Sequence, residues 1–148
     1  MNARTTGLIA LLFLGGCGSM TPPAGYIKVK SGEGYDAKYV SAHGNVVALT
    51  IRSNEDRAAD LKFWTQAVEY QKVDLDGMKL AERSDMTSNS GLAGTLFSFR
   101  TGEGRGEITY LVGLYVTPMR IYTVEATGPS ESFDADIPRI KESMRSIH

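Results

Sequence analysis

Residues 108–116 read ITYLVGLYV, a run of apolar, aromatic and β-branched residues that predicts a strand,. One set of alternate positions holds only apolar and aromatic side chains, and the other set includes Leu111 and Tyr115. Because successive side chains of a strand point to opposite faces of its sheet, both faces of this strand are partly apolar. Such a strand is typical of the centre of a sheet that is covered on both sides.

Turn-forming residues on either side of this strand separate it from further strands. The turn signals lie at 88–91, 102–106 and 117–119, and no helical pattern interrupts the region between them,. Consecutive strands with short links are antiparallel neighbours. The expected strands are 78–86, 92–100, 107–116 and 120–127, preceded by a hairpin of 38–42 and 45–52 around His43-Gly44.

A first helix is predicted between the hairpin and these four strands. Ser53 and Asp56 have the spacing of a capping box, so the helix is expected to follow them and to run to about Lys72,. Residues at helical spacing predict the side that packs on the sheet. They are Leu61, Trp64 and Val68, with Gln71 as a further position, and Phe63 and Ala67 widen the stripe.

A second helix closes the chain. Its apolar positions are separated by four, three, four and three residues, which gives one continuous seam along a helix,. Pro138 is compatible with this helix because it falls near the N-terminus of the helix. The order is therefore ββ-α-ββββ-α, an α+β domain with about six antiparallel strands and helices packed on them. The seam consists of Phe133, Ile137, Ile140, Met144 and Ile147.

This layout resembles that of the Mog1/PsbP-like domains. The resemblance covers roughly residues 34–148 and rests on the Phe63-Trp64 pair in the first helix, the long antiparallel meander and the closing helix. Known members of that fold serve as binding or assembly factors, so the resemblance implies a function without catalysis. It provides no catalytic or binding motif that could be transferred residue by residue.

The N-terminal segment ends in the sequence LGGC at residues 14–17. It contains Arg4 and the apolar run 7–14, which is too short to cross a bilayer because a spanning helix needs about 20 residues,. The arrangement resembles the lipobox of bacterial lipoproteins. The resemblance implies a signal peptide over 1–16 and a diacylglycerol on the sulfur of Cys17. The alternatives are an ordinary secretory signal and a buried element in which the cysteine is a packed thiol.

A lipidated cysteine would hold the chain on a membrane of the cell envelope, since two acyl chains suffice for stable attachment. Gly18 and Ser19 follow the cysteine without an aspartate, and in Gram-negative lipoproteins this pattern implies the outer membrane, facing the periplasm. We expect a tether over 17–33 and a single globular domain over 34–148. The alternation in 26–30 (YIKVK) indicates an edge strand as the alternative to a loose tether,.

The composition excludes several partners and cofactors. Sixteen Lys and Arg stand against 17 Asp and Glu, a net charge of −1, so there is no electrostatic case for nucleic acid,. The single cysteine, once lipidated, leaves no thiol for a disulfide or a metal,. Asp74 and Asp76 resemble the start of a calcium loop, but Lys79 stands where a further oxygen ligand is needed,. We therefore expect neither a metal nor a cofactor.

Candidate functional residues are few. His43 lacks the nucleophile and carboxylate that a catalytic histidine needs, so we expect no catalytic residue. The glycine-rich loop 101–107 lies between two strands and not before a helix, which argues against a phosphate site. Gly104 and Arg105 at its tip are candidate contact residues. If a sheet face is left open, an amphipathic contact patch is expected to contain Tyr110, Tyr115 and Tyr122,.

Three functions are compatible with these features. The first is a lipid-anchored accessory module that binds another envelope protein without chemistry of its own. The second is a carrier or sensor of a small ligand, with an aromatic-lined pocket between sheet and helices of at least about 300 Å³. The third is an enzyme, which would need carboxyl groups with shifted pKa values in a cleft.

Overall fold

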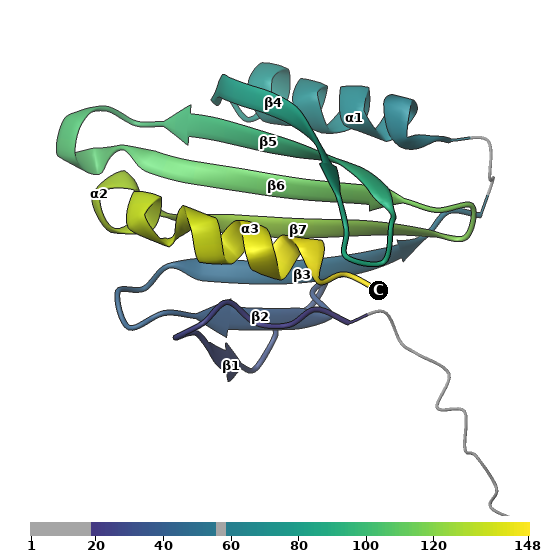
Figure 1. The fold of residues 1–148 in the computed structure, drawn as a ribbon. Coiled ribbons are helices and arrows are strands. Elements are labelled where there is room, and N and C mark those ends of the chain that lie inside the picture. Colours follow the sequence, from purple (N-terminus) through teal and green to yellow (C-terminus); the bar gives the residue numbers. More distant parts are fainter. Residues whose placement is uncertain (1–18, 56–58) are drawn as a thin grey trace, which may run out of the picture.

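The computed structural model of the chain describes residues 19–55 and 59–148, which form one antiparallel sheet with helices on both faces (Figure 1). The predicted α+β class and the meander of the last four strands are confirmed. The sheet has seven strands and not about six, because a short strand precedes the hairpin. In spatial order the strands are β1 (Ile27–Val29), β2 (Ala37–Val40), β3 (Val46–Ser53), β7 (Arg120–Pro129), β6 (Ile108–Val116), β5 (Ala93–Thr101) and β4 (Lys79–Thr87).

Strand β6 lies between β5 and β7, and both of its faces are buried, as its sequence predicted. Leu111 and Tyr115 belong to the core under the C-terminal helix. Val112 and Leu114 belong to a second core on the opposite face of the sheet, together with two phenylalanines of β5. The alternation along β6 therefore supplies side chains to two separate cores.

The first helix, α1 (Leu61–Tyr70), begins later than the capping-box spacing predicted. Ser53 is the last residue of β3, and Asp56 lies outside the described residues. The cap is Asp60, whose carboxylate accepts a hydrogen bond of 2.9 Å from the backbone amide of Phe63. This bond satisfies one of the amides that the first turn of a helix leaves without a partner.

Beyond its regular part, α1 continues into a π-helical turn, η1 (Gln71–Leu75), so the helical segment passes the predicted end near residue 72. The stripe of Leu61, Trp64 and Val68 packs against the second core, as predicted. Trp64 is therefore a packing residue, half-buried between α1 and the sheet.

The C-terminal helical segment covers the other face of the sheet. It consists of a short helix α2 (Ser130–Phe133), a 3₁₀ turn η3 (Asp134–Asp136) and α3 (Ile137–Arg145). Pro138 lies at the start of α3, where its missing amide proton breaks no helical bond,. The predicted seam is confirmed. Ile137 is partly buried, and the other four side chains have no exposed surface: Phe133, Ile140, Met144 and Ile147.

The segment before β1 is packed on the domain, which corrects the expected tether over 17–33. Met20 and Tyr26 are buried in the core under the C-terminal helix. The backbone amide of Ser19 donates a hydrogen bond of 3.3 Å to the carbonyl oxygen of His148. The edge-strand alternative is confirmed by β1, and the folded part includes residues well before 34. Residues 1–18, with the lipobox and Cys17, lie outside the described residues.

A buried carboxylate, Asp136, joins the N-terminal segment to the C-terminal helices. Its Oδ2 accepts a hydrogen bond of 2.8 Å from the hydroxyl of Tyr26 and one of 3.1 Å from Nδ2 of Asn45. Its Oδ1 forms an ion pair with Arg139. Burial acts to raise the pKa of Asp136, but the hydrogen bonds from Tyr26, Asn45 and Arg139 outweigh it and lower that pKa,. Asp136 therefore holds its charge while it connects three parts of the chain.

Candidate functional site

Exposed apolar side chains gather along α1, η1 and the start of β4, which lie side by side in Figure 1. Among the described residues, seven large hydrophobic side chains are exposed, and four of them lie on these elements. Several large exposed hydrophobic side chains on neighbouring elements mark a candidate contact surface, whereas single exposed hydrophobic residues are common on any protein. The four residues, called here the α1–β4 surface, are Phe63 (54% exposed), Tyr70 (58%), Leu75 (60%) and Leu80 (36%).

The helical geometry explains why two of these rings are exposed together. Phe63 and Tyr70 are seven residues apart, almost two full turns, so both project from the same side of α1,. Trp64 lies on the inner side, and the ring of Phe63 meets it edge-on with 5.3 Å between the ring centroids. This edge-to-face contact favours one orientation of the exposed Phe63 ring,.

Leu80 belongs to the same side of the sheet. It pairs in register with Phe99 of β5, which is part of the core under α1, so the two side chains lie on one face,. Strand β4 is the outer strand of the sheet, and a bulge between Leu80 and Glu82 interrupts its pairing. The α1–β4 surface therefore includes a sheet edge as well as a helix.

A wide groove of about 700 Å³ separates the first half of α1 from β4. At its floor the hydroxyl groups of Thr65 and Thr95 are 3.0 Å apart. Farther along the helix, Arg83 of β4 pairs with Glu69 of α1 at 2.5 Å. The groove is open to solvent along its length, so it suits an extended or convex partner more than an enclosed small molecule.

A charged cluster fastens η1 to the sheet beside this surface. Lys72 lies 3.3 Å from Asp76 and 3.4 Å from Glu125, and its ammonium group is 4.6 Å from the ring centroid of Tyr110. The Tyr110 hydroxyl donates a hydrogen bond of 2.5 Å to the carboxylate of Glu125. Burial, followed by this bond to a carboxylate, raises the pKa of Tyr110 well above its usual value. Tyr110 is therefore a neutral donor that holds the cluster in place.

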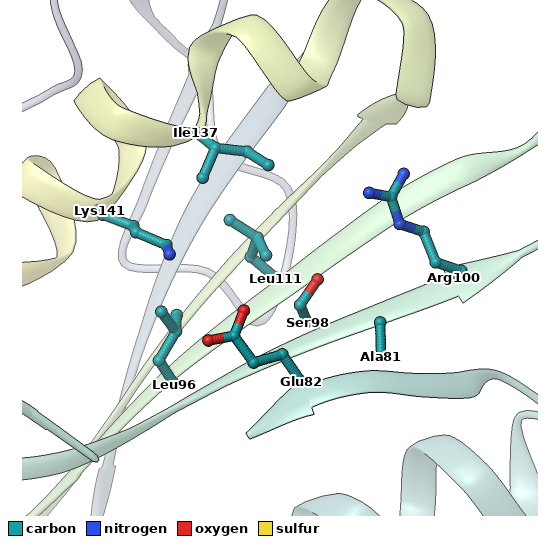
Figure 2. Close-up of a pocket in the computed structure, with 8 residues that line it drawn as sticks. All are labelled: Ala81, Glu82, Leu96, Ser98, Arg100, Leu111, Ile137 and Lys141. Carbon is teal, nitrogen blue, oxygen red and sulfur yellow. The ribbon is translucent and has the colours of Figure 1, made fainter. Parts of the chain in front are cut away.

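A smaller pocket of about 210 Å³ lies on the opposite face of the sheet, between β4–β5 and α3. Its base is apolar, and Glu82 and Lys141 extend toward the pocket from its two sides (Figure 2). The volume is below the range of about 300–1,000 Å³ that is typical of ligand sites. The lining residues are Ala81, Glu82, Leu96, Ser98, Arg100, Leu111, Ile137 and Lys141.

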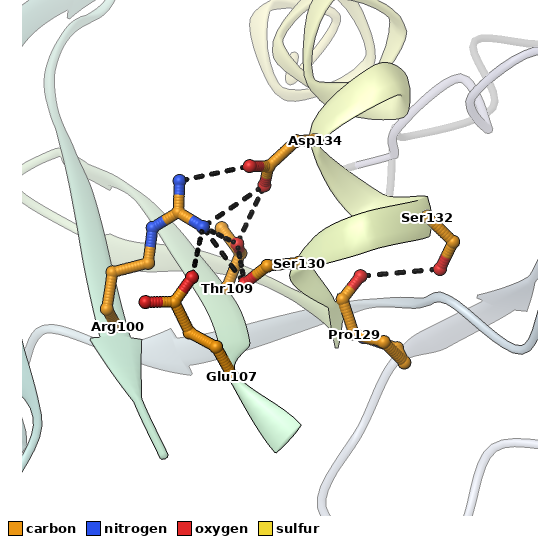
Figure 3. A network of polar contacts seen from close by, with 7 residues as sticks. All are labelled: Arg100, Glu107, Thr109, Pro129, Ser130, Ser132 and Asp134. Carbon is orange, nitrogen blue, oxygen red and sulfur yellow. Dashed lines mark hydrogen bonds and ion pairs between the residues drawn. The ribbon is translucent and has the colours of Figure 1, made fainter. Parts of the chain in front are cut away.

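Arg100, at one end of this pocket, is held by a polar network (Figure 3). Nη1 of its guanidinium donates hydrogen bonds to Glu107 (3.3 Å), Thr109 (2.6 Å) and Ser130 (2.9 Å). Nη2 donates a hydrogen bond of 3.2 Å to Asp134. Two carboxylates therefore compensate the charge of Arg100. The network ties the start of β6 to α2 and η3, which is a structural function.

The tyrosine patch predicted from the sequence is not formed. Tyr115 has no exposed surface and Tyr122 is 7% exposed, and both belong to the core under α3. Tyr110 lies on the opposite face, against the core under α1. Burial raises the pKa of Tyr115 to about 12, and its hydroxyl is a buried group without a hydrogen-bond partner. Tyr110 and Tyr115 lie on opposite faces of β6 because they are an odd number of positions apart, and helices cover both faces,.

The remaining predicted residues lie apart from the α1–β4 surface. Gly104 and Arg105 form an exposed 3₁₀ turn, η2 (Gly104–Gly106), between β5 and β6. His43 is exposed in the turn between β2 and β3. In residues 19–55 and 59–148 no group of three or more acidic, histidine or cysteine side chains is arranged to hold a metal ion. Within those same residues no helix is long and apolar enough to cross a membrane.

Comparison with known proteins identifies the fold. No family model matches the chain, and no curated protein matches it. The solution structure of cyanobacterial PsbP (CyanoP) from Synechocystis sp. PCC 6803 is similar, with a TM-score of 0.62 and 12% identity over 86% of this chain and 83% of that one. The chain therefore has a PsbP-like fold, as its layout predicted.

Two further solved structures share this fold. LpqN of Mycobacterium tuberculosis, described as involved in cell envelope biogenesis, has a TM-score of 0.65 at 11% identity, covering 88% of this chain and 83% of LpqN. PA94 of Pseudomonas aeruginosa, a protein of unknown function described as a putative regulator, has a TM-score of 0.56 at 16% identity with the same coverage. At these identities the likeness concerns the fold alone.

The α1–β4 surface was missed in the sequence because Phe63 was assigned to the inner stripe of α1. A signal was present in the spacing. Phe63 comes one position before Trp64 and Tyr70 one position before Gln71, and the two rings share a side of the helix with each other. Two rings seven residues apart and outside the main stripe indicate a second apolar face.

Proposed function

We propose that this protein is a lipid-anchored cell-envelope module that binds a protein partner through the α1–β4 surface and has no catalysis of its own. The exposure of four large hydrophobic side chains on neighbouring elements is the observation that carries the binding function: Phe63, Tyr70, Leu75 and Leu80. Aromatic residues dominate the energy of protein interfaces, and the edge-to-face contact with Trp64 reduces the conformational freedom that Phe63 would lose on binding,.

The location in the envelope rests on the LGGC sequence at 14–17. The fold shared with LpqN, a protein involved in cell envelope biogenesis, supports this setting. The absence of an aspartate after Cys17 supports the outer membrane in a Gram-negative cell. The open groove beside α1 supports a macromolecular partner, since a small ligand would remain largely exposed in it,.

Replacing Cys17 by serine is expected to move the protein from the membrane to the soluble fraction, because serine cannot form the thioether to the lipid. Fractionation and the intact mass of the mature chain measure the effect. The matched control is Thr21→Ser, which lies outside the lipobox and is expected to remain in the membrane. A wild-type chain that starts elsewhere than Cys17, or that carries no acyl mass, would overturn the anchor.

Photo-crosslinking from the α1–β4 surface tests the partner. A benzophenone amino acid at Phe63 or at Tyr70 is expected to capture the same envelope protein in intact cells. The matched control is Ile27, which is 69% exposed on β1 at the other edge of the sheet.

Once the partner is purified, Phe63→Ala is expected to weaken its binding by tenfold or more, about 1.4 kcal/mol. Ile27→Ala is expected to leave the affinity unchanged. Equal capture from residues 27, 63 and 70, or an unchanged affinity for Phe63→Ala, would contradict the assignment.

A small-ligand carrier is the second candidate, and the pocket between β4–β5 and α3 is the observation in its favour. Glu82 and Lys141 would bind a small zwitterion there. The pocket has about 210 Å³ and no aromatic side chain in its lining, so it does not match the aromatic-lined cavity expected from the sequence.

A further inference from the structure

We infer that one end of the sheet, the end with the β4–β5 and β6–β7 turns, lies directly against the bilayer that holds the lipid. This surface, called here the membrane end, rests on the proposed anchor at Cys17. Its occupant is a phospholipid surface. The inference fixes how the α1–β4 surface is presented to its partner.

Covalent geometry places the anchor close to the domain. Cys17 and Ser19 are separated by one residue, and two extended residues span at most about 7 Å,. An acylated Cys17 must sit where its acyl chains can enter the hydrocarbon layer. The position of Ser19 on the domain therefore determines which surface approaches the bilayer.

Several contacts fix Ser19 beside the C-terminus. Its amide donates to the carbonyl of His148 at 3.3 Å, and its hydroxyl lies 2.7 Å from Nε2 of the same residue. The amide of Thr21 donates 2.8 Å to the hydroxyl of Ser146, and Met20 between them is buried. Exposing the buried Met20 side chain to water is unfavourable, so its burial resists detachment of the segment,.

The C-terminus lies at one end of the sheet. The amide of Asn89, in the β4–β5 turn, donates 2.7 Å to the carbonyl of Arg145, and Ser90 donates 3.2 Å to the carbonyl of Ile147. The β6–β7 turn is at the same end, because Gly94 pairs with Tyr115 just before that turn. Figure 1 shows the C-terminus and both turns at this end. The anchor and these turns therefore share one end.

The side chains at this end suit a lipid surface. Met119 is 59% exposed at the tip of the β6–β7 turn, where it can enter the interfacial region. The exposed cations Arg120 and Arg145 lie beside the two turns, and Glu55 is a nearby exposed anion. Basic groups next to an anchor are attracted to anionic headgroups.

The orientation has a consequence for binding. Helix α1 begins near the membrane end, since the amide of Asn54 donates 2.9 Å to the carbonyl of Met119 shortly before the helix starts. The η2 turn is at the far end of strands of nine residues, about 30 Å away,. The α1–β4 surface thus runs outward from the bilayer and faces sideways, toward a neighbour in the same membrane.

Fluorescence quenching by lipids tests the orientation on the full-length, lipidated protein. The chain has one cysteine, so a second cysteine introduced at Met119 or at Arg105 becomes the only free thiol once Cys17 is acylated. Each variant is labelled with bimane and reconstituted into vesicles of phosphatidylethanolamine and phosphatidylglycerol that contain doxyl lipids. The label at 119 is expected to be quenched at least threefold more strongly than the label at 105.

Insertion of twelve Gly and Ser residues between Gly18 and Ser19 is the matched control, and it is expected to abolish this difference. Equal quenching at 119 and 105 in protein with acyl mass on Cys17 overturns the orientation and leaves the anchor intact. Protein without acyl mass overturns the anchor, and the orientation with it. The same difference in the insertion variant would also overturn the inference, because the short link would then not be its cause.

Discussion

Replacing Asp136 by alanine is expected to lower the free energy of unfolding by about 3 kcal/mol, which is a large fraction of the stability of a domain of this size. The change removes the acceptor of two donors, the Tyr26 hydroxyl and the Asn45 amide, in a region where Asp136 itself is 3% exposed. A buried donor without a partner costs about 1–3 kcal/mol. Urea unfolding at neutral pH measures the loss.

Two variants make this result specific. Glu142→Ala removes an exposed carboxylate from the same helix as Arg139 and is expected to change stability by less than about 0.5 kcal/mol,. Asp136→Asn keeps one acceptor oxygen and is expected to lie between alanine and wild type. If Asp136→Ala proved as stable as Glu142→Ala, the cluster would not hold the N-terminal segment in place.

The same cluster gives the stability a pH dependence at both extremes. Because the pKa of Asp136 is lower in the folded protein than its ordinary 3.8, its contribution is complete above that value and is lost as the pH falls through the folded pKa,. Burial, and then the bond to Asp136, raises the pKa of Tyr26 to about 12. The contribution of Tyr26 is therefore present below pH 10 and decreases between pH 10 and 12. In Tyr26→Phe the alkaline decrease should be smaller.

The regular elements could be predicted from the sequence because they depend on local patterns. Strands β5 and β6 follow from alternation and turn residues, and the seam of α3 follows from its spacing. The start of α1 could not, because a serine followed by an acidic residue three positions later also fits the end of a strand. Ser53 remains in β3 since it pairs with Arg120, a partner 67 residues away.

The functional surfaces were harder to predict because they depend on which faces the helices cover. Tyr110 and Tyr115 are separated by an odd number of positions in one strand, so the sequence places them on opposite faces,. The sequence does not show which face α1 or α3 covers. The packed N-terminal segment was missed for a similar reason. Its Pro and Gly residues indicate a loop, and the burial of Met20 requires α3 as a partner.

Gly94→Ala is the second substitution with a large expected effect, a loss of about 3 kcal/mol, the upper part of the range for overpacked sites. A Cβ at Gly94 would lie 2.5 Å from the ring of Tyr115 and 2.6 Å from the carbonyl oxygen of Leu114. Both residues belong to β6, which is paired with β5 at this point and packed on both faces. Neither the ring nor the strand can move away without opening a core.

A series of glycines separates this effect from the general effect of adding a methyl group. At Gly113 the added Cβ would be 3.1 Å from the sulfur of Met144, and a flexible thioether can move, so a loss near 1 kcal/mol is expected,. At Gly106 nothing lies within 4 Å, and the change should be below about 0.5 kcal/mol,. Thermal and urea unfolding of the three variants should rank them in this order. Equal stabilities for Gly94→Ala and Gly106→Ala would mean that β5 and β6 can separate locally, and the rigid two-sided sheet on which the α1–β4 surface is built would have to be abandoned.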